Sequence, residues 1–393
     1  MSEKSGSSSA IPFYRDERFL RTAAQIVSAA IIILFLIFVV INFINSAEAR
    51  GLSLGYGFLS SPAGFPISDP AIPYQPTDSF GRAFMVGVLN TLRVSVLGVF
   101  MATILGTLVA LARLSNNWLL SRISLAYIEF HRNIPLLVLL FIWYFTVFRE
   151  FPAIADSIRL PGPIYLNQRG FFFTWPRLNE NGWIFMAALL IGIVVAIAIW
   201  TRLRKRREIT GEETHYGRNS LIALLTFPLA GWFLAGGDPF WIDVPQFEGF
   251  NIQGGLRFTP EFSGLFVGLV TYTAAFIAEV VRAGIQAVDK GQREAAAAVG
   301  LNTFQVLSLV VLPQSLRIII PPMISQYLNL TKNSSLALAI GFQDLFSVGK
   351  IAINQAGRAV PVFVLVMVSY LLLSLFTSAV LNLYNRRIQL VTR

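Results

Sequence analysis

Long apolar runs that carry almost no charge constrain this chain more than any other feature. A transmembrane α-helix needs roughly 20 mostly apolar residues. Of the 393 residues, 55% are hydrophobic and only 13% are charged, about half the charged share of soluble domains. Because lipid cannot satisfy backbone hydrogen bonds, such runs cross a membrane as helices. The sequence therefore excludes an ordinary soluble protein and predicts an all-α, polytopic membrane protein.

About eight transmembrane helices are expected. The fifth is the weakest, because it is short and contains Pro228. The first resembles a signal peptide with a possible cleavage site at Ala47-Glu48-Ala49, but its apolar stretch exceeds the usual length, so we expect an uncleaved anchor. The predicted spans are 22–45, 84–112, 125–148, 183–200, 219–235, 263–282, 305–331 and 360–385.

The distribution of Lys and Arg predicts the orientation. With both termini in the cytoplasm, the inside segments hold twice as many Lys and Arg as the outside segments, and the run Arg202–Arg207 marks the inner end of the fourth span. The net charge of +10 is therefore a topology signal, and nucleic-acid binding is excluded. The run could also bind anionic lipid. Residues 1–10 are polar and Ser-rich, and we expect them to be disordered.

Several kinds of chemistry are absent from the sequence. There is no cysteine, and the two histidines, His131 and His215, are too few for a histidine metal cage. No phosphate-binding loop occurs, since Gly349-Lys350 is followed by Ile351. We therefore expect no metal site, no catalytic residue and no cofactor bound by this chain.

The most informative segment lies between the sixth and seventh predicted spans, at about 289–305. Glu294 to Val299 favours a helix, Gly300 can take the left-handed conformation that ends it, and Asn302 with Gln305 can form a capping box that starts another. The pattern predicts a helix, a sharp turn and a helix across the cytoplasmic ends of two spans. Its four successive alanines fit either a docking helix or a connector with high helix propensity, and the residues alone leave both open.

The same residues resemble the EAA loop of ABC importer permeases. Glu294-Ala295-Ala296, three residues, Gly300 and later Leu312-Pro313 carry the resemblance. Five further segments, in the same order as in the polar-amino-acid permeases, extend it: Thr91-Leu92-Arg93 with 106–113, Arg132-Asn133-Ile134-Pro135 with Leu136-Leu137-Val138, 272–282 with Gly291-Gln292, Leu312–Arg317, and Lys332–Leu336. One departure is Asn333, where the family often has Asp or Glu.

The resemblance implies a type I ABC importer permease core of five helices plus three extra ones, as in the longer permeases of broad-specificity L-amino-acid importers (the Aap/Bzt type). Residues 84–150 and 262–393 would form the two parts of that core. Residues 1–83 would be a cytoplasmic tail, an anchor helix and a periplasmic loop, and 151–261 an insertion with two helices and periplasmic loops.

The resemblance also implies partners and a mechanism. It implies a permease in a bacterial inner membrane that moves amino acids from periplasm to cytoplasm by alternating access. The expected partners are two ABC ATPase subunits that bind ATP and Mg, a second homologous permease in a heterodimer, a periplasmic amino-acid-binding protein and membrane lipid. The ATPase activity would then lie outside this chain, which is not itself an enzyme. The coupling residues carried over are Gln292, Glu294, Ala295, Ala296, Ala298 and Gly300.

Polar groups within or beside spans are the candidates for a substrate path. They are Arg93, Lys332, Asn333, Ser334 and Ser335. A lysine with neighbouring hydroxyls suits an α-carboxylate, although Lys332 could instead extend to the outer interface. Arg93 could face substrate or pair with a carboxylate in a structural role.

Two rival functions remain from the residues. An ion-coupled secondary transporter without ATPase subunits would need acidic residues at mid-span, but Glu129 and Glu279 lie near the cytoplasmic ends. Glu279 and Arg282 are three residues apart, which favours a local ion pair. A membrane-embedded enzyme would need clustered His, Asp or Glu, and the sequence has no such cluster.

Overall fold

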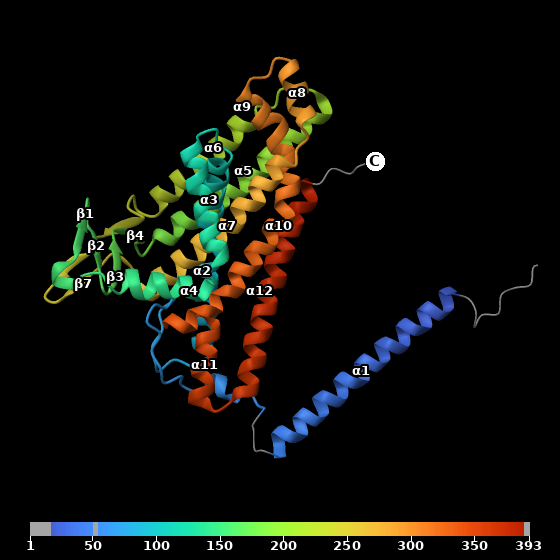
Figure 1. Cartoon of the computed structure of the whole chain (residues 1–393). Coiled ribbons are helices and arrows are strands. Elements are labelled where there is room, and N and C mark those ends of the chain that lie inside the picture. Colours follow the sequence, from blue (N-terminus) through green and yellow to red (C-terminus); the bar gives the residue numbers. More distant parts are fainter. Residues whose placement is uncertain (1–16, 50–53, 389–393) are drawn as a thin grey trace, which may run out of the picture.

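The computed structural model describes residues 17–49 and 54–388. The predicted disorder of residues 1–10 lies outside these ranges. Four long helices form the core: α2 (Phe80–Arg113), α7 (Pro260–Gln286), α10 (Leu312–Asn333) and α12 (Ala359–Ile388). Figure 1 shows them running side by side. Helix α1 (Glu17–Ala49) lies apart from them.

Small residues let α2 and α7 approach closely. A Cβ atom at Gly106 would lie 2.7 Å from Cγ2 of Ile277 and 2.8 Å from the carbonyl oxygen of Ala274, so only glycine fits there. Ala102 and Ala110 are fully buried on the same helix. Close backbone approach through small residues is the usual way that helices associate in a membrane.

The predicted span at 125–148 is a broken helix rather than a single rod. Helix α3 (Trp118–Asn133) ends before Pro135, and α4 (Leu136–Phe141) continues as the π-helical turn η3 (Ile142–Phe148). The two parts are bent by 107°. Because proline disfavours the α conformation of the residue before it, Ile134 is extended, with φ −98° and ψ 131°.

The insertion combines a helical hairpin with short strands. Helices α5 (Gly182–Thr210) and α6 (Tyr216–Leu234) form the hairpin, and they pack against each other more extensively than any other pair of elements. Sequence analysis did not predict the strands, which lie in the two segments that it expected to be loops. The strands are β1 (Ile158–Leu160), β2 (Ile164–Asn167), β3 (Gly170–Phe173), β4 (Trp175–Leu178), β5 (Phe240–Asp243), β6 (Gln246–Glu248), β7 (Asn251–Gln253) and β8 (Leu256–Phe258).

These strands pair antiparallel in three small sheets, in the orders β1-β2-β3-β8, β4-β5 and β6-β7. The β3–β8 and β4–β5 pairs join the part of the insertion before the hairpin to the part after it, so the sheets fix the hairpin to the core. The segments that form them, 158–178 and 240–258, are rich in aromatic residues and contain glycines that permit tight turns.

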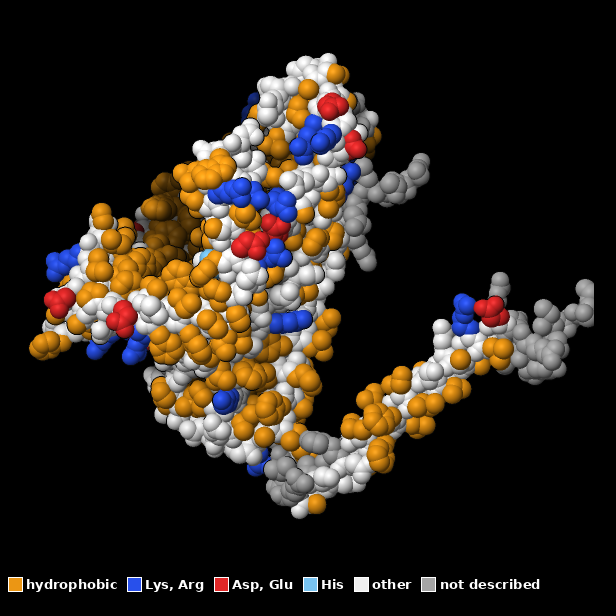
Figure 2. All heavy atoms as spheres, viewed as in Figure 1, with side chains coloured by type: hydrophobic (Ala, Val, Ile, Leu, Met, Phe, Trp, Pro, Cys, Tyr) orange, Lys and Arg blue, Asp and Glu red, His pale blue; other side chains and the backbone are white. Residues whose placement is uncertain are grey.

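A helix occupies each predicted span, but a count of eight is not confirmed. Among the described residues, six helices are long and apolar enough to cross a membrane, and the bent α3–α4 pair makes up to seven. Helix α6, the weakest prediction, is not among them. In Figure 2, hydrophobic side chains cover α1 and the flanks of the bundle, as expected of surfaces in lipid.

The two ends of the bundle carry different irregular segments (Figure 1). At one end, α8 (Lys290–Ala298), α9 (Thr303–Gln305) and the π-helical turn η5 (Val306–Val311) connect α7 to α10. At the other end lie residues 54–79 with η2 (Gly57–Ser60), the turn η6 (Ser334–Ile340) and α11 (Leu345–Ala356). A further short turn, η4 (Ile154–Asp156), precedes the strands.

Candidate functional site

Helix α8 is held at a fixed place between α7 and α10. The side chain of Asp289 caps it by accepting a hydrogen bond from the Gly291 N–H at 2.6 Å. Arg293 donates to the carbonyl oxygen of Ile285, near the end of α7, at 2.6 Å. Gln314 of α10 donates to the side chain of Gln292 at 3.4 Å. Side-chain contacts therefore tie α8 to both long helices.

The sharp turn after α8 forms as predicted from the sequence. Gly300 has φ +87°, a left-handed conformation that favours glycine. The Gly300 N–H donates to Ala297 O at 2.9 Å, and the Leu301 N–H donates to Ala296 O at 3.2 Å, which closes the end of the helix. Asn302 and Gln305 then form a full capping box. The loop geometry is confirmed, whereas the coupling role of its residues stays a prediction.

The exposed face of the helix pair α8–α9 carries small residues beside the carboxylate of Glu294. Ala296 is buried, but Ala295, Ala298, Glu294 and Gly300 are exposed. Two larger apolar side chains stand beside them, with Val299 78% and Phe304 77% exposed. Sequence analysis missed both, although apolar residues on either side of a predicted polar turn were a usable signal. An exposed apolar patch on a rigid helix pair is typical of a docking surface.

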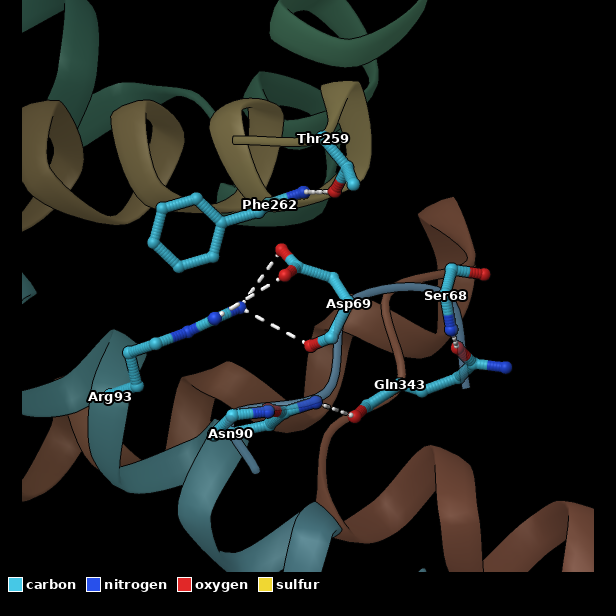
Figure 3. A network of polar contacts seen from close by, with 8 residues as sticks. Ser68, Asp69, Asn90, Arg93, Thr259, Phe262 and Gln343 are labelled. Carbon is cyan, nitrogen blue, oxygen red and sulfur yellow. Dashed lines mark hydrogen bonds and ion pairs between the residues drawn. The ribbon is translucent and has the colours of Figure 1, made fainter. Parts of the chain in front are cut away.

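Arg93 lies in a polar network at the opposite end of the bundle (Figure 3). Its guanidinium forms an ion pair with Asp69, with Nη2 2.9 Å from Oδ2, and Nη1 donates to Oδ1 at 3.3 Å. The guanidinium carbon also lies 4.7 Å from the centre of the Phe262 ring, a favourable cation–π geometry. Of the two roles left open by the sequence, the structure places Arg93 in a pair with a carboxylate.

Two amide side chains hold residues 66–71 down beside this ion pair. Asn90 accepts from the Ala71 N–H and donates to Gln343 O, both at 2.9 Å. Gln343 accepts from the Ser68 N–H at 2.6 Å and donates to Pro66 O at 3.0 Å. Sequence analysis missed Asp69, Asn90 and Gln343, because no local pattern indicates that segments so distant along the chain meet.

The four other substrate-path candidates lie together where α10 passes into η6. Ser334 donates to Thr331 O at 2.9 Å and Ser335 to Lys332 O at 2.8 Å, so both hydroxyl protons are used within their own turn. In the described part of the chain, the side chains of Lys332 and Asn333 make no hydrogen bond or ion pair. Nor does any such contact join these residues to Arg93.

One buried carboxylate was not foreseen. Asp344 is fully buried at the start of α11. It accepts from the Ser347 N–H at 2.9 Å and from the Tyr370 hydroxyl at 2.8 Å. Its bond to the Ser347 N–H makes Asp344 the N-cap of α11, and both of its carboxyl oxygens have partners. The predicted ion pair between Glu279 and Arg282 is confirmed, at 2.7 Å. Residues 17–49 and 54–388 contain no cluster of His, Asp or Glu that could hold a metal ion.

Comparison with known proteins gives consistent matches. Residues 220–390 match the model of a binding-protein-dependent transport system inner membrane component. The general L-amino acid transport system permease protein AapQ of Rhizobium johnstonii is 43% identical, over 96% of this chain and 94% of that protein. The putative amino-acid ABC transporter permease protein YhdX of Escherichia coli is 42% identical, over 90% of each chain.

A third relative also spans almost the whole chain. The glutamate/glutamine/aspartate/asparagine transport system permease protein BztB of Rhodobacter capsulatus is 38% identical over 96% of both chains. Among solved structures, an amino acid ABC transporter with histidines covers 78% of this chain and 95% of its own, with 20% identity and a TM-score of 0.47.

The chain therefore belongs to the inner-membrane components of binding-protein-dependent transport systems, and among these to the permeases of amino-acid ABC transporters. It is a multi-pass protein of the inner membrane and a transport component. The family works in general with ATPase and binding-protein partners.

Proposed function

We propose that this chain is the permease subunit of an ATP-driven importer that moves amino acids from periplasm to cytoplasm by alternating access. The observation that carries the proposal is the rigid, exposed helix pair α8–α9 between α7 and α10. Both termini lie in the cytoplasm, on the same side as that pair, which agrees with the distribution of Lys and Arg.

The helix pair couples the permease to an ATPase subunit. Ala295 and Ala298 allow a groove of the ATPase to approach closely, while Val299 and Phe304 supply apolar surface. Glu294 is exposed beside them, whereas Ala296 is buried and packs α8 against the rest of the chain. Arg293 and Gln292 tie α8 to α7 and α10, so closure of the ATPases moves both helices together.

The full transporter contains this chain with a second, homologous permease in a heterodimer, two ATPase subunits and a periplasmic amino-acid-binding protein. ATP and Mg²⁺ are bound by the ATPase subunits, and this chain binds no cofactor. Lys332, Asn333, Ser334 and Ser335 line the substrate path. Lys332 and Asn333 keep unused hydrogen-bonding groups for a substrate carboxylate, whereas Arg93 meets substrate only when Asp69 releases it.

The test exploits a pair of matched glycines. Gly300 and Gly211 both end helices in the left-handed conformation, with φ +87° and +71°, and a Cβ atom at either would meet nothing within 4 Å. A side chain at either position costs about 1–2 kcal/mol of local strain, which corresponds to about 5- to 30-fold in the population of the native turn. Only Gly300 lies in the proposed docking surface.

Gly300→Val should therefore lose binding-protein-dependent uptake in proteoliposomes while ATP hydrolysis becomes independent of substrate. Gly211→Val should transport normally, and both variants should be present in the membrane in equal amounts. Normal uptake by Gly300→Val would contradict the assignment of this loop to ATPase coupling. Uptake by the purified chain driven by an ion gradient, without ATP or an ATPase subunit, would instead establish the rival secondary transporter.

A further inference from the structure

The α5–α6 hairpin is tightly closed in one half and open in the other. A Cβ atom at Gly231 would lie 2.5 Å from Cβ of Ala188, and one at Gly192 would lie 2.9 Å from Cβ of Phe227, so the helices touch there. Pro228 interrupts α6 beside these contacts and favours a bend. Between these contacts and the loop that joins the helices, at 211–215, α5 and α6 together line an open groove.

The open half carries a wide, open groove of about 850 Å³. Its walls are one stripe of each helix, at the spacing of residues on a single helical face. They consist of Ile193, Ala196, Ile197 and Trp200 from α5 and Gly217, Ser220, Leu221 and Leu224 from α6. The groove is apolar apart from Ser220, which is 7% exposed. Its buried hydroxyl has no hydrogen-bond partner among residues 17–49 and 54–388.

The mouth of the groove is positively charged. Tyr216 contacts the Trp200 ring edge to face, with centroids 4.8 Å apart, and the Arg207 guanidinium lies 5.8 Å from the Tyr216 ring centre. Arg218, which is exposed, follows Gly217 in the first turn of α6, beside the groove wall. Neither Arg207 nor Arg218 forms an ion pair in the described part of the chain, whereas Arg204 and Arg206 are paired with glutamates.

Helix α6 also begins at this mouth. Its first residue is Tyr216, and its N-cap, His215, provides no side-chain hydrogen bond. The first N–H groups of the helix are thus available to an anion. An apolar groove, a buried hydroxyl without a partner and a cationic mouth at a helix N-terminus match one molecule with an apolar tail, ester oxygens and a phosphate.

We propose that the α5–α6 groove binds one anionic phospholipid of the cytoplasmic leaflet. An acyl chain lies along Ile193, Ile197 and Leu221, the Ser220 hydroxyl donates to an ester oxygen, and the phosphate lies between Arg207, Arg218 and the α6 N-terminus. The leaflet follows from the orientation in the proposed function, but the binding site itself does not depend on transport.

The test is native mass spectrometry of the full chain in mild detergent, titrated with phosphatidylglycerol and, separately, phosphatidylcholine. Removing two cations near a headgroup, in Arg207→Gln/Arg218→Gln, should weaken phosphatidylglycerol binding about 30-fold. The control, Arg204→Gln/Arg206→Gln, removes the same charge from arginines that are already paired and should bind as the wild type does. Gly217→Leu should block the groove without changing charge, since a Cβ there meets only the Trp200 ring, at 3.8 Å.

Three outcomes of these titrations would overturn the proposal. Equal weakening in both double variants would mean general surface attraction. Equal affinity for phosphatidylcholine would mean that the net negative charge of the headgroup is not recognised. Unchanged binding by Gly217→Leu would place the lipid elsewhere. Because the chain has no cysteine, Ile197→Cys can carry a photoactivatable group. An adduct with lipid supports the site, whereas an adduct with residues 17–49 or with a second permease shows that a helix fills it.

Discussion

The ion pair between Asp69 and Arg93 should keep residues 66–71 closed over α2. The two side chains are 15% and 24% exposed, between a surface pair, worth about 0–1 kcal/mol, and a buried pair, whose rupture costs about 3–5 kcal/mol. After allowing for solvent screening, Asp69→Asn should cost about 1–3 kcal/mol of local stability. That equals about a 5- to 150-fold larger population of the open segment.

Hydrogen exchange measures this opening directly. The Ser68 and Ala71 N–H groups donate to Gln343 and Asn90, so they exchange only when the segment lifts. Exchange in a peptide covering 66–71 should accelerate by the same 5- to 150-fold. The control is Asp156→Asn, the same change at an exposed aspartate without an ion pair.

A double-variant cycle completes the experiment. Asp69→Asn with Arg93→Gln should cost less than the sum of the single variants, because the second change removes a charge that the first has left without its partner. Exchange in Asp69→Asn no faster than in Asp156→Asn, or costs that add fully, would refute the view that this pair holds the segment closed.

Two further predictions concern the loop helices and the outer strands. Asn302→Ala removes the capping box and should cost about 1 kcal/mol, seen as faster amide exchange at the start of α9 and lower uptake; unchanged exchange would contradict it. The Gly255 N–H and the Arg177 guanidinium hold the pKa of the Asp243 carboxyl below its usual range. This stabilisation is present above the ordinary carboxyl pKa and is lost as pH falls through the lowered value. Exchange of the β4–β5 amides, corrected for intrinsic rates, should therefore accelerate on acidification, and less so in Asp243→Asn; an equal pH response would reject this.

The sequence alone determined the features that depend on nearby residues. Apolar runs located a helix at every predicted span, because the width of the membrane sets the length of the run. The turn at Gly300 and the capping box at Asn302 were readable, since each is closed by backbone and side-chain groups within about five residues of one another. Pro135 disfavours a helical conformation of the residue before it, but its presence in the sequence does not reveal a bend of 107°.

The tertiary structure decided which distant segments meet. Asn90 donates a hydrogen bond to Gln343, which lies 253 positions further along the chain. Many carboxylates in the sequence could have paired with Arg93, and only the packing of the helices places Asp69 beside it. The β3–β8 pairing joins strands on either side of the α5–α6 hairpin. Short-range chemistry could not determine these contacts, because each depends on where whole helices pack. The groove between α5 and α6 is of the same kind. Its walls are ordinary apolar stripes in the sequence, and it exists only because the two helices pack against each other, with close contacts at Gly192 and Gly231.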